Sequence, residues 1–174
     1  MDLIQNAYLD FLKGNQQSFE LIVKEFREPL ILYINSYVKN IYIAEDLTED
    51  TVVRLLVEKP HYTAKGSFKS GIYTIARNIT LDYLRHQSLT VEVELDEQRT
   101  YLQSHYNEKK QWVVDAMKKI SPQYSNILYL KYYEDFSNEE IAQILKKNKR
   151  QVETMLYRAK AALAEQLQEV KDEN

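Results

Sequence analysis

Residues 135–163 read DFSNEEIAQILKKNKRQVETMLYRAKAAL, a pattern that predicts two helices separated by a short polar turn. Ser137 and Glu140 have the spacing of a capping box, in which each side chain accepts a hydrogen bond from the other residue's backbone N–H. Ala142 is small, as is needed where two helices cross closely, and Asn148 can cap the second helix. A short capped helix, a turn and a longer helix are typical of a helix-turn-helix unit.

The second of these helices has a basic face opposite an apolar stripe. In helix-turn-helix proteins the N-terminal part of this helix enters the major groove, where Lys and Arg neutralise phosphates and Arg, Gln and Thr contact base edges. A plain helical hairpin with a basic, solvent-exposed face is the alternative. We expect the buried stripe to be Val152, Leu156, Ala159 and Leu163, and the residues that contact duplex DNA to be Lys149, Arg150, Gln151, Glu153, Thr154, Tyr157, Arg158 and Lys160.

The charge of the chain is distributed unevenly along the sequence. The 174 residues carry 23 basic and 26 acidic side chains, a formal net charge of −3, which does not by itself indicate a nucleic-acid-binding protein. Within this acidic chain, residues 60–90 have a net charge of +3 and residues 146–163 a net charge of +5. Basic islands of this kind indicate nucleic-acid binding, and chance clustering on solvated helix faces is the alternative.

Composition excludes several classes of protein. The chain has no cysteine, which excludes a disulfide scaffold, thiol catalysis and a cysteine zinc site. The three histidines have no metal-ligand spacing, so no metal or other cofactor is expected. No apolar run approaches the length of a membrane span, and residues 1–5 lack the basic and apolar segments of a signal peptide. We therefore expect a cytoplasmic protein.

The N-terminal half also has helical periodicity. Apolar residues at helical spacing predict a helix through Phe26, and Pro29 either kinks this helix or starts a new one. A further helix is expected from Ala44 to Glu58, and the next begins after Ser67, a good N-cap residue. The residues expected to be buried are Leu47, Thr51 and Leu55 in the first of these two helices, and Phe68, Ile72, Ile75, Ala76, Ile79 and Tyr83 in the second.

The helix that begins after Ser67 carries a candidate nucleic-acid surface. Basic residues interleaved with aromatic ones suit single-stranded DNA, because bases stack on the rings while the cations neutralise phosphates. Aromatic side chains in such a helix can also belong to the core, which is the favoured interpretation for Phe68. The residues in question are Asn78, Asp82 and Arg85, which share one face, the basic residues Lys65, Lys69 and Arg77, and Tyr62 and Tyr73, for which both interpretations stay open.

Three carboxylates, those of Asp46, Glu49 and Asp50, lie on one face of the helix expected over residues 44–58. Such a group can bind a divalent cation or act in acid–base catalysis. No nucleophile, histidine or further carboxylate is arranged around it, so we do not expect an enzyme. The remaining interpretations are acidic residues favoured by the dipole near a helix N-terminus and a docking face for a basic partner.

These patterns predict an all-α fold of two small helical bundles. The first bundle covers residues 1–87, and the second, which contains the helix-turn-helix, covers residues 105–174. Residues 88–104 read SLTVEVELDEQRTYLQS, which indicates a flexible polar linker. The apolar alternation within VEVEL would also suit a short strand, but the sequence offers no second strand to pair with it.

Together these segments resemble bacterial RNA polymerase sigma factors of the extracytoplasmic-function (ECF) group of the sigma-70 family. AEDLTEDTVVRLL (44–56) resembles region 2.2, and SFKSGIYTIARNITLDYLR (67–85) resembles regions 2.3 and 2.4. Residues 120–163 resemble region 4. The three segments occur in the family's order, with a variable linker where the family has one.

The resemblance implies a protein that binds core RNA polymerase and promoter DNA and directs promoter recognition, DNA opening and transcription initiation. Region 4 would contact the polymerase flap, and residues 149–160 would read the minus-thirty-five element as duplex. The residues implied to dock on the polymerase clamp helices are Asp46, Leu47, Glu49, Asp50 and Arg54. The residues implied to bind and open the minus-ten element, with a base flipped out near Asn78, are Lys65, Ser67, Lys69, Tyr73, Arg77, Asn78, Asp82 and Arg85.

The resemblance also implies an anti-sigma factor, in this family often membrane-anchored, and a linker that runs towards the polymerase active cleft. Four residues depart from the family pattern. Gly71 stands where Trp is usual, and Lys146 replaces a turn Gly, which predicts a positive φ or a shifted turn. Glu153 and Met155 remove positive charge from the recognition helix. Two other functions therefore stay open: a free-standing helix-turn-helix regulator, and a sigma-like interaction protein without promoter-opening activity.

Overall fold

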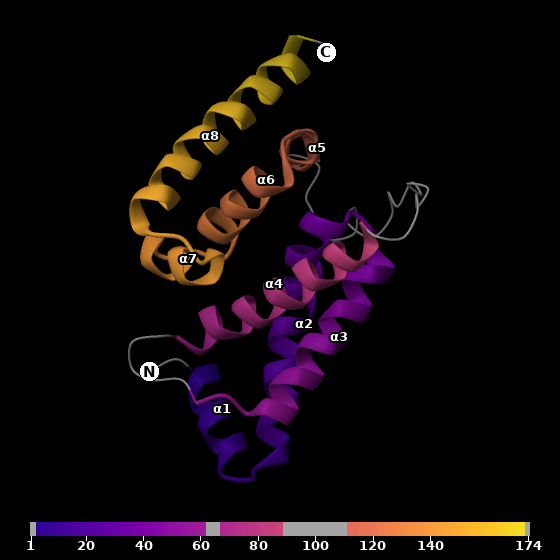
Figure 1. Cartoon of the computed structure of the whole chain (residues 1–174), viewed down its shortest axis with the longest axis vertical. Coiled ribbons are helices and arrows are strands. Elements are labelled where there is room, and N and C mark those ends of the chain that lie inside the picture. The colour runs from indigo at the N-terminus through magenta and orange to yellow at the C-terminus, as the bar shows by residue number, and fades with distance from the viewer. Residues whose placement is uncertain (1–2, 62–66, 89–110, 173–174) are drawn as a thin grey trace.

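The computed structural model describes residues 3–61, 67–88 and 111–172. Within these ranges the chain folds into helices with no β-strand, which confirms the all-α prediction. The helices form two bundles, with α1 to α4 in the lower half of Figure 1 and α5 to α8 in the upper half. The linker predicted over residues 88–104 lies, apart from Ser88, outside the described residues.

The first bundle contains α1 (Leu3–Leu12), α2 (Gln16–Val38), α3 (Ile41–Glu58) and α4 (Phe68–Gln87). Polar side chains cap three of these helices, because the first backbone N–H groups of a helix have no partner within it. Asn15 caps α2, Asn40 caps α3 and, as predicted, Ser67 caps α4 by accepting from the N–H of Ser70. The Asn40 cap starts α3 three residues before the predicted Ala44.

Pro29 lies inside α2, which continues through it from Gln16 to Val38. Of the two outcomes predicted for Pro29, a kink or a new helix, the start of a new helix is therefore wrong. A proline in a helix interior removes one backbone hydrogen bond and usually costs about 3 kcal/mol. The helix is held on both sides of Pro29 by fully buried residues, namely Ile22, Leu30, Ile31, Tyr33 and Ile34.

Aromatic side chains fill the core of the first bundle. The ring of Phe68, buried as favoured from the sequence, stacks on Tyr8 of α1 with centroids 4.4 Å apart and meets Phe26 of α2 edge-on at 5.8 Å. The hydroxyl of Tyr8 donates to the carbonyl of Pro60 at 2.8 Å, and burial raises its pKa to about 12. These contacts tie α1 to the start of α4 and to the residues that follow α3.

The second bundle contains α5 (Gln111–Lys119), α6 (Pro122–Leu128), the π-helix η2 (Tyr129–Tyr133), α7 (Asn138–Leu145) and α8 (Lys149–Asp172). The predicted signals are confirmed: Ser121 caps α6 with Pro122 at its first position, and Ser137 and Glu140 form the capping box of α7. Asn148 and Gln151 exchange hydrogen bonds of 2.8 and 2.9 Å at the start of α8. The start expected near His105 lies outside the described residues.

The turn between α7 and α8 has a left-handed backbone at Lys146. A positive φ there was one of the two predicted outcomes, the other being a shifted turn. Lys146 has φ 52° and ψ 48°, a conformation that costs a residue with a side chain roughly 1–2 kcal/mol. The N–H of Lys147 donates to the carbonyl of Ala142 at 2.9 Å, which satisfies an otherwise unpaired end of α7. The turn therefore keeps the ordinary geometry of a glycine turn without glycine.

The two bundles are packed against each other rather than held apart. Helix α7 lies against α4, and α6 lies against α2 (Figure 1). The buried side chains of both bundles form one continuous hydrophobic core. The contact between the bundles therefore decides which of the predicted functional residues are exposed to solvent.

Candidate nucleic-acid and protein interfaces

The N-terminal half of α8 presents an open polar face. All eight residues predicted to contact duplex DNA are exposed, and Tyr157 reaches 76% exposure. On the opposite side Val152, Leu156 and Ala159 are buried as predicted, whereas Leu163 is only half-buried. Because α8 buries one stripe against α5, α6 and α7, its other face is left free for a ligand.

Opposite charges meet at the start of this face. Lys149 Nζ lies 2.6 Å from the carboxylate of Glu139 on α7, and both side chains are exposed. A hydrogen bond from Lys149, together with its positive charge, holds the pKa of Glu139 below its ordinary value. Since Glu153 is also exposed here, the face carries mixed charge rather than a continuous basic stripe.

Helix α4 carries its predicted residues on two different sides. Asp82 and Arg85 are exposed and form an ion pair of 3.3 Å, with Asn78 half-buried one turn before Asp82. Arg77 is also half-buried, and its Nε atom is buried without a hydrogen-bond partner in the described part of the chain. Lys65, like Tyr62, lies outside the described residues.

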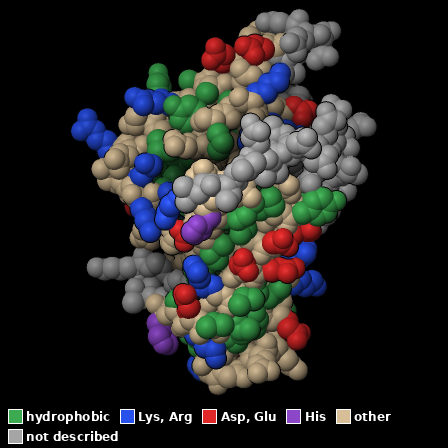
Figure 2. All heavy atoms as spheres, turned by 45° about the vertical axis from the view of Figure 1, so that its right-hand side comes forward, with side chains coloured by type: hydrophobic (Ala, Val, Ile, Leu, Met, Phe, Trp, Pro, Cys, Tyr) green, Lys and Arg blue, Asp and Glu red, His purple; other side chains and the backbone are tan. Residues whose placement is uncertain are grey.

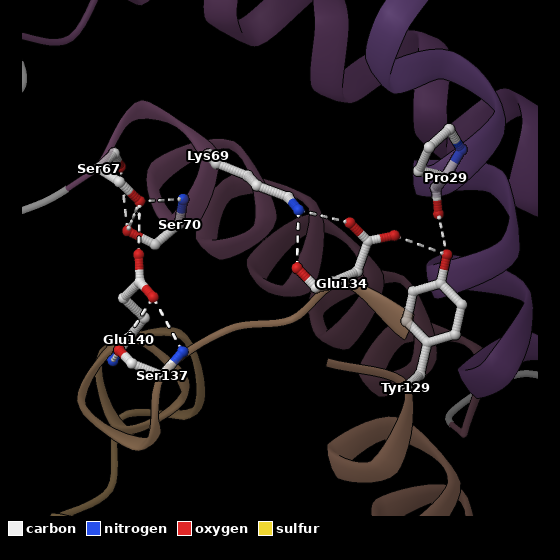
Figure 3. Close-up of polar contacts among 8 residues, drawn as sticks. All are labelled: Pro29, Ser67, Lys69, Ser70, Tyr129, Glu134, Ser137 and Glu140. Carbon is white, nitrogen blue, oxygen red and sulfur yellow. Dashed lines mark hydrogen bonds and ion pairs between the residues drawn. The ribbon is translucent and has the colours of Figure 1, made fainter. Parts of the chain in front are cut away.

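Ser67 and Lys69, at the start of α4, face the second bundle and bind acidic residues there (Figure 3). The hydroxyl of Ser67 donates to Glu140 Oε1 at 2.9 Å. Lys69 Nζ forms an ion pair of 3.0 Å with Glu134 and also donates to its backbone carbonyl at 2.8 Å. The Glu134 side chain is only 6% exposed, so this is a largely buried ion pair.

Tyr73 requires a correction, because it is a core residue in this structure rather than an available DNA contact. Its side chain has 0% exposure. Its ring meets Tyr33 of α2 at 5.0 Å and Phe136 of the second bundle at 5.2 Å, both edge-on. Burial, followed by the nearby charge of Glu134, raises the pKa of Tyr73 well above its ordinary value.

Helix α3 presents the three predicted carboxylates to solvent: Asp46, Glu49 and Asp50 are all exposed. Leu47 requires a correction, because it is buried in the core with Thr51 and Leu55 and is only 6% exposed. Arg54 is exposed and forms an ion pair of 3.5 Å with Glu58, one helical turn further on.

Apolar side chains extend the acidic face of α3, and the sequence analysis missed them. Residues at helical spacing from the carboxylates share their side of the helix, and four of these are large and exposed: Tyr42, Val53, Leu56 and Val57. Figure 2 brings this side of the molecule forward and shows acidic and hydrophobic side chains next to each other. We call this set, with Asp46, Glu49 and Asp50, the α3 stripe.

Neither a metal site nor a membrane-spanning helix occurs among the described residues. Over residues 3–61, 67–88 and 111–172 there is no group of three or more residues that could hold a metal ion. No helix in the same ranges combines the length and the apolar character that crossing a bilayer requires.

Comparison with known proteins identifies the family of the two bundles. Residues 22–90 match Sigma-70 region 2, and residues 110–163 match Sigma-70, region 4. RNA polymerase sigma factor SigV of Bacillus subtilis (strain 168) is 31% identical over 128 residues, which cover 71% of this chain and 75% of SigV. The chain belongs to the sigma-70 family, in its ECF group.

Other sigma factors match most of the length of this sigma-70 family member. ECF RNA polymerase sigma factor SigW of Bacillus subtilis (strain 168) is 23% identical over 184 residues, covering 97% of this chain and 98% of SigW. The sigma factor RpoE, in a co-crystal structure with the anti-sigma factor NepR from Bartonella quintana, superposes with a TM-score of 0.71. That comparison covers 87% of this chain and 98% of RpoE at 19% identity, so it supports the shared fold.

Proposed function

We propose that this protein is a non-enzymatic sigma factor that binds core RNA polymerase and directs promoter recognition, DNA opening and transcription initiation. The observation that carries the proposal is the presence of three separate exposed surfaces in the family's order. These are the α3 stripe, the Asn78–Asp82–Arg85 side of α4, and the polar face of α8. A free-standing helix-turn-helix regulator would need only the last of them.

The α8 face would read the minus-thirty-five element in the major groove. Arg150 and Thr154 lie one turn apart and both are exposed, so their side chains can reach neighbouring base edges or phosphates. Each phosphate contact contributes about −0.9 to the slope of the logarithm of the binding constant against the logarithm of the salt concentration. Because this face has few cations, the affinity for DNA should depend only moderately on salt. Weak binding to duplex DNA alone fits a protein that polymerase holds in place.

The exposed side of α4 would bind the minus-ten element as single-stranded DNA. Asn78 and Arg85 offer hydrogen-bond donors, and the Asp82–Arg85 ion pair of 3.3 Å lies on this side with both side chains exposed. A base that is flipped out of the stack needs polar partners for its pairing edge, and half-buried Asn78 is placed to provide one. Tyr73 is left out of this surface because it is buried.

The α3 stripe would dock on the clamp helices of polymerase. Carboxylates complement a basic partner and speed its encounter. Exposed apolar side chains at the centre of a contact supply most of its affinity when they become desolvated. Val53, Leu56 and Val57 provide that apolar centre beside the acidic residues, and the second bundle would contact the flap.

An anti-sigma factor is the remaining proposed partner. The RpoE structure that shares this fold was solved with the anti-sigma factor NepR, and the proposal carries this kind of regulation over to the present chain. A protein that covers the α3 stripe would compete directly with polymerase. The test is to measure binding of a cytosolic anti-sigma domain to the parent chain and to a variant in which the charges of the α3 stripe are reversed. Weaker binding to the variant would support this assignment.

Run-off transcription tests the proposed function. A library of genomic fragments is transcribed by core polymerase with and without the protein, and we expect new discrete start sites that share upstream elements. If the protein binds polymerase but yields no new starts, it is an interaction protein without promoter-opening activity. If it neither binds polymerase nor yields starts, and instead binds duplex DNA alone as a dimer, it is a free-standing regulator.

A further inference from the structure

The polar face of α8 offers a free hydrogen-bond donor and a free acceptor at its centre. Helix α8 lies on the outer side of the second bundle (Figure 1), and its first turns expose Arg150, Glu153 and Thr154 on one side. The hydroxyl of Thr154 donates to the carbonyl of Arg150 at 2.9 Å, so its hydrogen is used within the helix. In the described part of the chain, neither the guanidinium of Arg150 nor the carboxylate of Glu153 has a hydrogen bond or an ion pair.

The other polar side chains at the start of α8 are already bound to the protein. Lys149 lies one turn before Glu153, but its ammonium is 2.6 Å from the carboxylate of Glu139. This hydrogen bond and the charge of Glu139 raise the pKa of Lys149, and the charge of Glu153 adds a smaller contribution. Gln151 is tied to the cap of the helix, where its Oε1 atom accepts from the N–H of Asn148 at 2.9 Å. The carboxylate of Glu153 therefore stays available to a ligand.

A carboxylate on a face that meets DNA is selective about the base in front of it. When ionised it only accepts hydrogen bonds, and the phosphates of DNA repel it. In the major groove the base groups that donate are the amino groups of cytosine (N4) and adenine (N6), whereas guanine and thymine present acceptor oxygens. The adenine amino group lies next to the acceptor N7, which repels the second carboxylate oxygen, while cytosine has no such acceptor. Cytosine is therefore the base that fits.

We propose that Glu153 is a specificity-determining residue, whose carboxylate accepts a hydrogen bond from the N4 amino group of a cytosine in the minus-thirty-five element. The inference rests on the proposed function, because that function places α8 in the major groove of this element. Arg150, one turn earlier, supplies the complementary donor, since a guanidinium pairs with O6 and N7 of guanine. The two side chains leave the helix about 4.5 Å apart along its axis, which is close to the base-pair spacing of about 3.4 Å.

Cations near Glu153 offset its repulsion from the phosphates. Arg158 and Lys160 are exposed further along α8, and contacts from such side chains to phosphates carry no information about the base sequence. Glu153 instead lowers the affinity for every sequence except those that place an amino group against it. The carboxylate thus acts by rejecting the wrong bases as well as by attracting the right one, and specific interfaces use both effects.

Selection from a randomised element tests this assignment. The minus-thirty-five segment is randomised in a promoter recovered by run-off transcription, and the complex of the chain with core polymerase selects the sequences that it binds. The parent complex should enrich cytosine at one position of one strand. Glu153→Ala should remove the preference at that position alone. Glu153→Gln should move the preference to adenine, because an amide group can accept from N6 and donate to N7.

The same neutralisation at another position of α8 is the matched control. Glu165→Gln removes one negative charge at an exposed position beyond residues 149–160, and its base preferences should equal those of the parent complex. Because Glu153 and Glu165 are both exposed, their substitution should have little effect on stability. Thermal unfolding of each variant checks this expectation.

Removal of the amino group from the base tests the contact from the side of the DNA. A duplex in which 2-pyrimidinone replaces the selected cytosine lacks the N4 amino group. The parent complex should bind this duplex about 5- to 150-fold more weakly than the unmodified one, whereas the Glu153→Ala complex should lose much less. The weaker base pair affects both complexes alike, so the difference between their losses reports the contact itself.

The possible results separate this inference from the proposed function. If Glu153→Ala raised the affinity for every sequence and left all base preferences unchanged, the carboxylate would only repel DNA. The inference would then be wrong while the proposed function stood. Equal losses of the parent and Glu153→Ala complexes on the 2-pyrimidinone duplex would overturn the inference in the same way. Absence of any polymerase-dependent binding to promoters by the parent chain would instead overturn the proposed function.

Discussion

Helices α4 and α8 follow the same local rules but differ in how much of their predicted DNA-binding surface is free. Each begins at a polar cap, Ser67 or Asn148, and buries an apolar stripe. On α8 all predicted contacts are exposed, whereas on α4 the second bundle covers Ser67, Lys69 and Tyr73. Helix α8 is packed from one side only, while α4 is packed by the first bundle and by α7. The comparison shows that the local sequence pattern finds the polar face of a candidate recognition helix, and that tertiary packing decides how much of that face is exposed.

The largest expected effect concerns the docking of core RNA polymerase on the α3 stripe. Asp46→Lys combined with Asp50→Lys should abolish binding to core polymerase, because the reversed charges repel the basic surface that the α3 stripe is proposed to meet. The fold should be unaffected, since exposed substitutions usually change stability by less than about 0.5 kcal/mol. Pull-down with core polymerase and thermal unfolding measure the two quantities.

A matched control separates position from net charge in that experiment. Glu20→Lys combined with Glu25→Lys makes the same charge change at exposed positions of α2, outside the α3 stripe, and should leave polymerase binding intact. Normal binding by the Asp46/Asp50 variant would show that the α3 stripe is not the docking surface.

The next effect tests whether the open face of α8 is used. Arg150→Ala should weaken binding of the polymerase complex to duplex containing the minus-thirty-five element by about 5- to 150-fold, as expected for loss of a good base or phosphate contact worth about 1–3 kcal/mol. Electrophoretic mobility shift with the assembled complex measures it. Lys24→Ala removes an exposed cation from α2 and should have no effect. Unchanged binding and transcription on every cognate promoter would contradict the role of α8.

Features that depend on a few neighbouring residues could be predicted from the sequence. The caps at Ser67, Ser137 and Asn148 were found because each satisfies backbone groups within one turn of itself. The left-handed Lys146 was one of two outcomes that the missing turn glycine allowed. The start of α3 was placed too late because the Asn40 cap precedes the first clear apolar spacing.

Features that depend on the second bundle could not be predicted in the same way. Tyr73 was assigned to DNA because its helical position is compatible with either role, and the ring of Phe136 that helps to bury it lies 63 residues further along the chain. The partners of Ser67 and Lys69 are similarly distant, at separations of 73 and 65 residues. By contrast, the exposed apolar part of the α3 stripe was within reach, because Val53 follows Asp46 at i+7.

A smaller effect, on pH dependence, distinguishes the covered helix from the open one. The pKa of Glu140 is lowered in this structure from its ordinary value of 4.5, against its partial burial, by hydrogen bonds from Ser137 and Ser67 and by the charge of Lys69 on α4. The bonds from Ser137 lie within the cap of α7 and do not depend on the contact between the bundles, so only the hydrogen bond from Ser67 and the charge of Lys69 favour the packed form through this carboxylate. That stabilisation is present at higher pH and is lost as the pH falls through the lowered pKa, so the distance between spin labels at Glu25→Cys on α2 and Glu165→Cys on α8, both exposed positions, should lengthen on acidification below about pH 4.5.

Two variants assign that pH dependence. Glu140→Gln should reduce the acid-induced change in label distance, because residue 140 no longer titrates. Glu139→Gln should retain it, since Glu139 pairs with Lys149 inside the second bundle and does not bridge the two helices. Equal curves for Glu140→Gln and the parent chain would remove Glu140 from the contact that covers α4.

The smallest expected effect concerns the turn that positions α8. Lys146→Gly should stabilise the protein by up to about 1 kcal/mol, because glycine adopts φ 52° without the strain of a side chain, and this gain exceeds its loss of chain entropy. The free energy of unfolding in urea measures this stabilisation.

Lys147→Gly is the matched control: Lys147 has no positive φ, so the same mutation there should destabilise the protein. Helix α4 has no such turn at its start, where Ser67 has φ −70°, so glycine at position 67 should only destabilise, through loss of the cap and of the hydrogen bond to Glu140. If Lys146→Gly lowered stability as Lys147→Gly does, the left-handed turn would not be the strained element that joins α7 to the open helix.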